Sequence, residues 1–312
     1  MRLNKLALSM ILGCIFLIFL IQRKKMNRTV NLKSLLKYAF IASERGGNAI
    51  LKSRNTLVIK KKGLTKEGLE EKVTSADFRS HCTMVNTIKN KYPSLNIISE
   101  ESDATCSNDN ENYHSTKFDS AIDFLEDEWV HIEDITIWID PLDATHEFTE
   151  KLYQYVTTMV CVALNGRPVI GVIHKPFQNV TSWAWVGKAK SYDLNSRSKV
   201  NNEKLRISIS RSHSGKIREV LHSKLNDYEL VVAAGAGYKS LQVAYGEVDA
   251  YLHATAIKKW DICAGNAIID ASGGQMTDKE NNKIDYSRET SVVNENGLIG
   301  TLKDHFKFLG IL

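Results

Sequence analysis

The sequence lacks several features that would indicate a function class at once. Its 312 residues contain no internal repeat, no low-complexity tract and no Cys-x-x-Cys pair, so a zinc site is not expected. The net charge is only +5, and the cluster Arg23, Lys24, Lys25 and Arg28 supplies much of it. The charge therefore predicts no nucleic-acid partner. A chain of this length buries a substantial core in one large or two fused domains.

Only one long apolar run is evident, over residues 6–21. A bilayer span takes about 20 apolar residues, with a lower limit near 17, so this run is at the short edge and suits a thin early-secretory membrane. No small-residue cleavage site follows, which favours an uncleaved signal anchor over 1–25 rather than a removed signal peptide or a buried helix. Basic residues after the run outnumber those before it, so charge alone would place the rest of the chain in the cytosol.

The 5 cysteines leave the cellular compartment open. Cys14 lies in the apolar run. Cys161, in an apolar strand, and Cys263, in an apolar helix, are expected to pack as small hydrophobic side chains. Cys82 and Cys106 could pair, but connectivity cannot be deduced from sequence.

Hydrophobic periodicity predicts helices and strands along the whole chain. Helical spacing over 32–52 is interrupted at Gly46-Gly47, and a capping box at Thr74–Asp77 begins a helix that ends near Lys91. A basic loop covers 60–66, and 102–134 reads as a surface insertion around one short helix. The remaining expected elements are strands at 156–164, 169–174 and 181–186, with a hairpin turn at Asn165-Gly166, then alternating strands and helices at 206–209, 215–225, 230–234, 237–245, 250–253 and 261–269.

Acidic residues cluster where one apolar strand ends. The run Ile135–Ile139 leads into Asp140, Pro141 is expected to break the strand, and Asp143 and Thr145 follow in a turn or first helical positions. Like charges at short range are costly unless a cation lies between them, so this segment predicts Mg²⁺ held by carboxylates. The alternative is an ordinary strand-end turn capped by Asp.

Two further acidic segments strengthen the metal prediction. Glu100 and Glu101 follow a second apolar strand, and Asp261 begins a helix after Lys259-Trp260. Each alone is explained by solvation or by the helix dipole. Gathered in one cleft, the three segments would hold two or more divalent ions, which suits in-line displacement at phosphorus.

These three segments, with Val73-Thr-Ser-Ala-Asp77, resemble the motifs of the lithium-sensitive, magnesium-dependent phosphatases of the inositol monophosphatase superfamily. The match keeps its order from about residue 31 to the C-terminus. The resemblance implies an α/β (α+β) fold, a layered αβαβα sandwich, and two or three Mg²⁺ ions. It implies that metal is bound by Glu100, Asp140, Asp143, Asp261 and the Leu142 carbonyl, and that Asp77 and Thr145 orient and deprotonate the attacking water, Asp77 also facing a third metal.

Finer details resemble the branch of the superfamily that removes the 3′-phosphate of adenosine 3′,5′-bisphosphate (PAP) in the Golgi. The likeness is carried by 155–163, 171–177, 210–215 and 257–263, and Ala144 stands where inositol monophosphatases usually have Gly. It implies that the nucleotide is held by Ser210, His213, Gly235 and Lys239. His253 stands where inositol monophosphatases tend to carry an acid, which is mild evidence against an inositol substrate.

The same resemblance implies a single-pass type II Golgi membrane protein, and we prefer this orientation to the one that charge favours. The expected organisation is a lumenal phosphatase domain at 26–312, divided into a metal-binding half (31–200) and a nucleotide-contacting half (201–312). Asn179-Val-Thr181 is a glycosylation sequon in an expected hairpin turn. An inositol phosphate phosphatase and a non-catalytic nucleotide-binding membrane protein are the alternatives, and a homodimer is left open.

Overall fold

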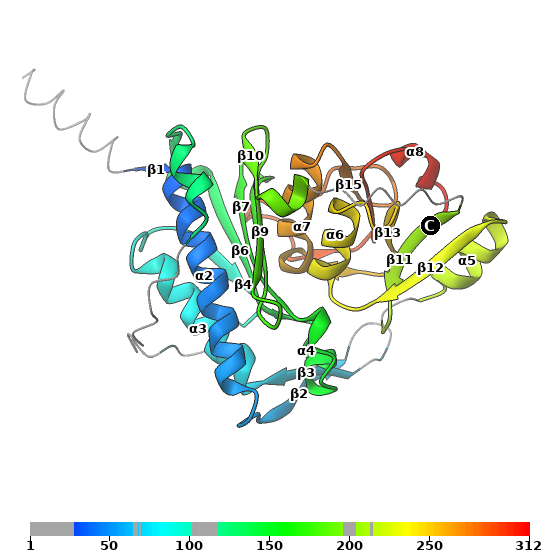
Figure 1. Ribbon diagram of the computed structural model, residues 1–312, viewed down its shortest axis with the longest axis horizontal. Helices are drawn as coiled ribbons and strands as arrows, with labels where there is room; N and C mark the ends of the chain where they lie inside the picture. The colour runs from blue at the N-terminus through cyan, green and yellow to red at the C-terminus, as the bar shows by residue number, and fades with distance from the viewer. Residues whose placement is uncertain are drawn as a thin grey trace, which may run out of the picture.

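The computed structural model describes residues 28–64, 68, 70–101, 106, 118–195, 204–212 and 215–312. These residues form alternating layers of helix and sheet (Figure 1). The anchor predicted over 1–25 lies outside them. Within the described ranges no helix is both long and apolar enough to cross a bilayer.

The first helical layer consists of α2 (Leu32–Ser53) and α3 (Ser75–Lys89). The interruption expected at Gly46-Gly47 is wrong, because α2 continues through both residues. A Cβ at Gly46 would lie 2.6 Å from Met84 Cγ, and one at Gly47 would lie 2.5 Å from His174 Cδ2. The two glycines therefore let α2 lie close to α3 and to the sheet. The predicted capping box at Thr74 and Asp77 is confirmed.

A six-stranded sheet packs under these helices. Its order is β10 (Ala189–Lys190), β9 (Val180–Trp185), β8 (Arg167–Lys175), β7 (Thr157–Leu164), β6 (Ile135–Asp143) and β4 (Asn96–Ser99), with only β4 and β6 parallel. The predicted hairpin turn is confirmed by φ angles of +49° at Asn165 and +75° at Gly166. Strand alternation directs Ile137 and Val160 toward α2 and α3, and Trp138 and Cys161 toward the opposite face.

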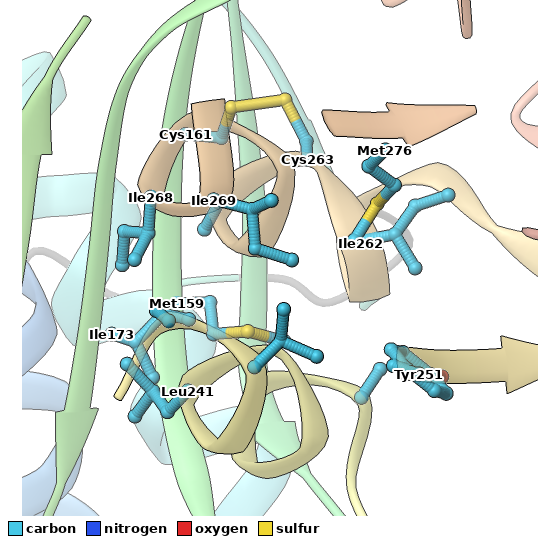
Figure 2. Close-up of a cluster of buried hydrophobic side chains, with 14 of the residues drawn as sticks. Met159, Cys161, Ile173, Leu241, Tyr251, Ile262, Cys263, Ile268, Ile269 and Met276 are labelled. Atoms are coloured by element: carbon cyan, nitrogen blue, oxygen red, sulfur yellow. A yellow bond between two sulfur atoms is a disulfide. The ribbon is translucent and has the colours of Figure 1, made fainter. Parts of the chain in front are cut away.

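The remaining layers complete the expected αβαβα order. Helices α6 (Ala236–Ala244) and α7 (Lys259–Ala271) pack on the second face of the large sheet through the buried cluster in Figure 2. Next comes a five-stranded sheet in the order β12 (Tyr228–Ala233), β11 (Leu205–Ser210), β13 (Ala250–His253), β17 (Leu298–Thr301) and β15 (Gln275–Thr277). Apolar side chains of α5 (Ile217–Lys224) and α8 (His305–Phe308) cover its outer face.

Several short elements connect the layers. Residues 60–64, expected in a loop, instead lie in β2 (Ile59–Leu64), because β3 (Glu70–Thr74) offers an antiparallel hydrogen-bonding partner that the local sequence does not reveal. The other short elements are β1 (Thr29–Asn31), η1 (Ser120–Phe124), β5 (Trp129–His131), η2 (Ile132–Asp134), α4 (Thr145–Thr149), η3 (Tyr153–Tyr155), η4 (Tyr192–Asn195), β14 (Ile257–Lys258) and β16 (Val293–Asn294). Of these, η1 is a short helix in the expected insertion.

Two disulfides join elements distant in the sequence. Cys82 pairs with Cys106, which answers the question that the sequence leaves open. Cys161 and Cys263 also pair, across a sequence separation of 102 residues. The expectation that these two act as separate small hydrophobic side chains is wrong. Both are buried as expected, but they lie opposite each other between the large sheet and α7.

Candidate active site

Strand β6 is longer than the sequence predicts and includes the acidic motif. The strand was expected to end at Asp140, yet it continues to Asp143 with a register shift between these two residues. A bulge tolerates Pro141, which cannot donate to the ladder, without ending the strand. The Pro141 carbonyl accepts a hydrogen bond from Ser80 Oγ at 2.6 Å, which ties the bulge to α3.

Three predicted metal ligands converge at the end of this sheet. Oxygen atoms of Glu100, Asp140 and Asp261 all lie within 4.8 Å of one another. Glu100 follows β4, whose parallel pairing with β6 brings it beside Asp140, and Asp261 is the third residue of α7. Glu100 retains 25% of its side-chain exposure, so solvent reaches the group.

The electrostatics of this acid cluster (Glu100, Asp140 and Asp261) favour a cation. Burial, and then the neighbouring acids, raise the pKa of Asp140 and of Asp261 well above the ordinary value. Burial also raises the pKa of Glu100 to about 7, although Lys62 opposes the shift. Because carboxylate oxygens are the ligands that Mg²⁺ prefers, the donor set fits a divalent magnesium ion.

Lys62, on β2, is a contact that the sequence analysis missed. Its Nζ lies 3.0 Å from Glu100 Oε1 and 2.5 Å from Glu101 Oε1. The basic run around Lys62 was the available signal, but the strand pairing that aims this side chain at the acids is not visible in the sequence. The ammonium group supplies positive charge at one side of the acid cluster.

The two residues expected to activate water are in direct contact. Thr145 Oγ1 lies 2.9 Å from Asp77 Oδ1 and 3.0 Å from the Leu142 carbonyl oxygen. Asp77 Oδ2 accepts hydrogen bonds from Thr74 N at 2.8 Å and Thr74 Oγ1 at 2.6 Å. Burial raises the pKa of Asp77 to about 6, against the effect of these hydrogen bonds. Asp77 can therefore exchange a proton near neutral pH.

Asp143 is held differently from the acid cluster. Its Oδ1 accepts from Ala236 N at 3.1 Å, while its Oδ2 accepts from Gly237 N at 2.8 Å and Thr157 Oγ1 at 3.1 Å. The amide groups at the start of α6 therefore neutralise part of its charge. Gly235 has φ +72°, and a Cβ there would lie 2.9 Å from Asp143 Oδ2.

The predicted nucleotide residues are less fully assembled. Ser210 is buried at the end of β11, and His213 lies outside the described residues. Lys239 is only 2% exposed, and its Nζ donates to the Gly235 carbonyl at 2.7 Å. The same Nζ lies 5.0 Å from the ring centroid of Tyr251. Burial lowers the pKa of Lys239 to about 8, while Asp143 opposes that shift.

Glu147 connects the metal motif to the start of the predicted nucleotide turn, which the sequence analysis did not foresee. Its buried Oε1 accepts from Ser212 Oγ at 3.0 Å and lies 3.4 Å from Arg211 Nη1. Arg211 also pairs with Glu150 at 2.6 Å. These contacts fix residues 211–212 against α4.

Comparisons with known proteins agree with this architecture. A model of the inositol monophosphatase family matches residues 31–307. Inositol monophosphatase 3 of Xenopus laevis is 44% identical over 295 residues, covering 91% of this chain and 83% of the relative. The Golgi-resident adenosine 3′,5′-bisphosphate 3′-phosphatase of Homo sapiens is 42% identical over 288 residues, covering 88% and 78% respectively. The crystal structure of the extragenic suppressor protein suhB from Bartonella henselae has the same fold, with a TM-score of 0.64 at 18% identity, covering 88% of this chain and 96% of that one.

Proposed function

Because the chain belongs to the inositol monophosphatase family, we propose that this phosphatase is Mg²⁺-dependent and hydrolyses PAP to AMP and phosphate in the Golgi lumen. There it would clear the by-product of sulfotransferases. The acid cluster of Glu100, Asp140 and Asp261 carries the proposal, because three carboxylates converge next to the Asp77–Thr145 pair. An inactive nucleotide-binding protein would have no reason to keep three carboxylates this close together.

The acid cluster would hold the metal ions, with Asp143 and the Leu142 carbonyl as the further proposed ligands of two or three ions. Bound Mg²⁺ supplies positive charge to the phosphoryl group and to the leaving oxygen. In this proposal the Thr145 hydroxyl donates to Asp77 Oδ1, so that its oxygen can accept a hydrogen bond from the attacking water. Asp77 then accepts the proton that the water loses, which its pKa of about 6 permits near neutral pH.

The 3′-phosphorylated nucleotide is favoured as substrate by the human relative and by the segments that resemble its branch. In the proposal Ser210, His213, Gly235 and Lys239 contact the nucleotide, and the Glu147 contacts to 211–212 hold the turn in place. The second candidate is an inositol phosphate, which the printed name of the Xenopus relative favours. His253 accords with the first candidate, because inositol monophosphatases tend to carry an acid at this position; its Nε2 lies 3.0 Å from Thr255 Oγ1.

We further propose a type II topology, with an anchor at 6–21 and a lumenal domain. Two disulfides suit an oxidising compartment. Asn179 is exposed, with φ +53°, in the turn between β8 and β9, so its sequon is accessible for glycosylation. An endoglycosidase shift that Asn179→Gln removes would support the lumenal orientation. Protease sensitivity of the domain in intact microsomes would support a cytosolic one.

Phosphate release by the full chain tests the activity. PAP and inositol 1-phosphate are compared at equal concentration with Mg²⁺, with a chelator, and with added Li⁺. The proposal expects Mg²⁺-dependent, Li⁺-inhibited release that favours PAP by at least about tenfold in kcat/KM, roughly one charge-assisted hydrogen bond. Equal or faster hydrolysis of inositol 1-phosphate would move the assignment to the second candidate, and full turnover with chelator would contradict the metal.

A further inference from the structure

The buried Cys161–Cys263 disulfide joins the two structural elements that carry Asp140 and Asp261. We propose that this bond positions Asp261 against Asp140, and that the two cysteines are therefore positioning residues of the metal centre. The inference rests on the proposed metal-dependent function. It concerns the geometry of the acid cluster, and it assigns no contact between sulfur and the metal.

On the sheet side, the disulfide lies close to Asp140. Trp138 and Asp140 are two residues apart on β6, so their side chains leave the same face of the strand. Trp138 is the register partner of Cys161 on β7, and Asp140 is the register partner of Met159. On this face of the sheet, the pair that contains Cys161 is therefore the immediate neighbour of the pair that contains Asp140.

On the helix side, the separation is equally short. Asp261 and Cys263 are the third and fifth residues of α7. Two helical residues are rotated by about 200°, so the two side chains leave nearly opposite sides of the helix. The bond between Cys263 and the sheet therefore fixes the direction in which Asp261 leaves α7, and a carboxylate oxygen of Asp261 lies within 4.8 Å of oxygens of Glu100 and Asp140. The Cα atoms of the two cysteines are 5.7 Å apart, which leaves α7 little freedom to slide.

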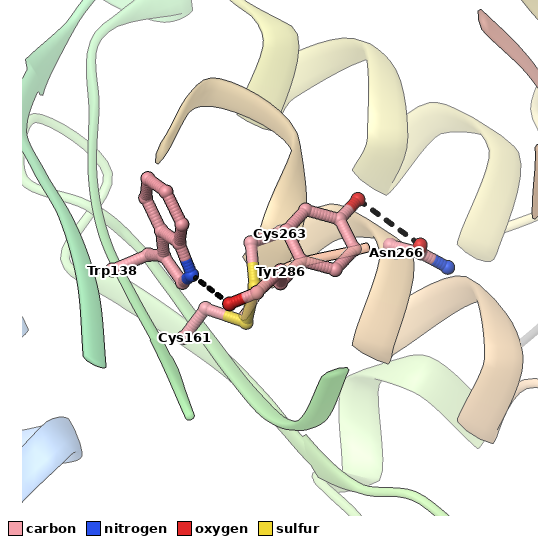
Figure 3. Close-up of a disulfide and its surroundings, with 5 residues drawn as sticks. All are labelled: Trp138, Cys161, Cys263, Asn266 and Tyr286. Carbon is pink, nitrogen blue, oxygen red and sulfur yellow. Dashed lines mark hydrogen bonds between the residues drawn. A yellow bond between two sulfur atoms is a disulfide. The ribbon is translucent and has the colours of Figure 1, made fainter. Parts of the chain in front are cut away.

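The packing around the bond supports a fixed register between α7 and the sheet. Gly171, the register partner of Cys161 on β8, lies so close to α7 that a Cβ there would be 2.3 Å from the Ala264 carbonyl oxygen. Tyr286 bridges the same two elements (Figure 3): Trp138 Nε1 donates to its carbonyl at 2.9 Å, and its hydroxyl lies 3.1 Å from Asn266 Oδ1. A shift of α7 against the sheet would therefore disturb both the close approach of Gly171 to Ala264 and the Tyr286–Asn266 hydrogen bond.

The second disulfide provides a contrast. Cys82 and Cys106 are half-buried and close a separation of 24 residues, and Cys106 is separated from Glu101 by four intervening residues. This bond does not join β6 or β7 to α7. Its removal is therefore expected to affect stability without changing the distance between Asp140 and Asp261.

The test compares Mg²⁺ binding by metal-free wild-type protein and by the double variant Cys161→Ala/Cys263→Ala, measured by isothermal titration calorimetry. Peptide mapping under non-reducing conditions first verifies the bond in the wild type. Groups that orient metal ligands typically change affinity by about 10–100-fold, so we expect about tenfold weaker Mg²⁺ binding. At saturating Mg²⁺ the PAP turnover number should return to within about threefold of wild type, because the acids themselves are unchanged.

Two controls separate positioning from loss of stability. Ile269→Ala removes buried volume from the same cluster, in the second half of α7, and should leave Mg²⁺ affinity unchanged, as should Cys82→Ala/Cys106→Ala. Cys161→Val/Cys263→Ala restores part of the buried volume without a bond and should still bind Mg²⁺ weakly.

Wild-type affinity in the Cys161/Cys263 variants would overturn the proposal, and so would an equal loss in Ile269→Ala. Free thiols in the folded wild type, or failure of both bond-free variants to fold, would also overturn it, since the bond would then be absent or required by the whole fold. If the wild type itself binds no Mg²⁺, the proposed function fails instead.

Discussion

The acid cluster and the predicted nucleotide-binding residues differ in what determines their positions. Glu100, Asp140 and Asp261 come from three elements and converge because the end of β4, the bulged part of β6 and the start of α7 meet at the same end of the large sheet. Gly235, proposed to contact the nucleotide, lies beside Asp143, and the buried Lys239 donates from Nζ to the Gly235 carbonyl. The positions of the three acids therefore follow from the topology of the strands and α7. The contacts of Lys239 and of the backbone at Gly235 depend instead on how the side chains around them pack.

We expect the largest loss of activity when one carboxylate of the acid cluster is removed. Asp140→Asn and Asp261→Asn each remove a negative charge that the other acids cannot replace, so activity should fall at least about 1000-fold and approach background. Phosphate release from PAP measures this. Asp123→Asn, an exposed residue of η1 paired with Lys37, is the matched control and should retain activity. Activity within tenfold of wild type in either cluster variant would exclude that residue as an essential ligand.

The next effect isolates the proton acceptor. Thr145→Ala and Asp77→Asn should lower kcat by about 10²–10⁴-fold, because general-base assistance acts in the transition state. The KM for PAP and the calorimetric Mg²⁺ affinity should change less than kcat. Unchanged kcat in one variant would remove that residue from the proposed base.

A substitution at Lys239 tests whether this residue contacts the nucleotide or only balances the charge of Asp143. If it contacts the nucleotide, as proposed, Lys239→Ala should lower kcat/KM for PAP about tenfold while changing inositol 1-phosphate hydrolysis little. If its ammonium group serves mainly as the counter-charge of Asp143, both substrates should lose equally. The ratio of the two kcat/KM values distinguishes these outcomes, and Lys279→Ala, outside the site, serves as the control.

The pH dependence of stability reports on the acid cluster without a substrate. The pKa of Glu100 is raised from 4.5 to about 7 and that of Asp77 from 3.8 to about 6, so the folded metal-free protein binds more protons than the unfolded chain between these values. These two groups should therefore lower its stability as pH rises from about 4 to about 7, whereas His81 and His174, whose pKa burial lowers from 6.5 to about 4, act in the opposite direction below about pH 6.5. Urea unfolding of the metal-free wild type and of Glu100→Gln at pH 5 and pH 8 isolates the cluster, because the histidines contribute to both proteins alike. The wild type should lose more stability than the variant on going to pH 8, and Mg²⁺ should reverse that loss; an equal change in both proteins would contradict the shift at Glu100.

The smallest expected effect concerns Ala144, in the turn between β6 and α4. Ala144 precedes α4 with φ +66°, a left-handed conformation that costs an L-residue about 1 kcal/mol. Ala144→Gly should therefore raise the free energy of unfolding by up to about 1 kcal/mol, less the backbone entropy of glycine. Chemical denaturation measures this. A loss of stability would mean that the Ala144 methyl group makes packing contacts that outweigh the strain.

Sequence reasoning reached the capping box and the hairpin turn because each depends on local chemistry, and it reached the acid residues through their places beside apolar segments and their resemblance to a family motif. Asp77 and Thr74 are three residues apart, and Asn165-Gly166 needs positive φ wherever it lies. It missed the continuation of β6 past Pro141, since a bulge depends on the neighbouring strand. It likewise missed the disulfide partner of Cys161, which is distant along the chain and opposite it only after the helix packs on the sheet.

The most direct test of the central claim is a crystal structure with Mn²⁺ in place of Mg²⁺, located by anomalous scattering. The account predicts at least one strong peak bonded to oxygens of Glu100, Asp140 and Asp261, at about 2.0–2.3 Å from each bonded oxygen. A second peak beside Asp143 and the Leu142 carbonyl would complete the proposed two-ion centre. A fully loaded crystal with Mn²⁺ elsewhere, and none among these three carboxylates, would contradict it.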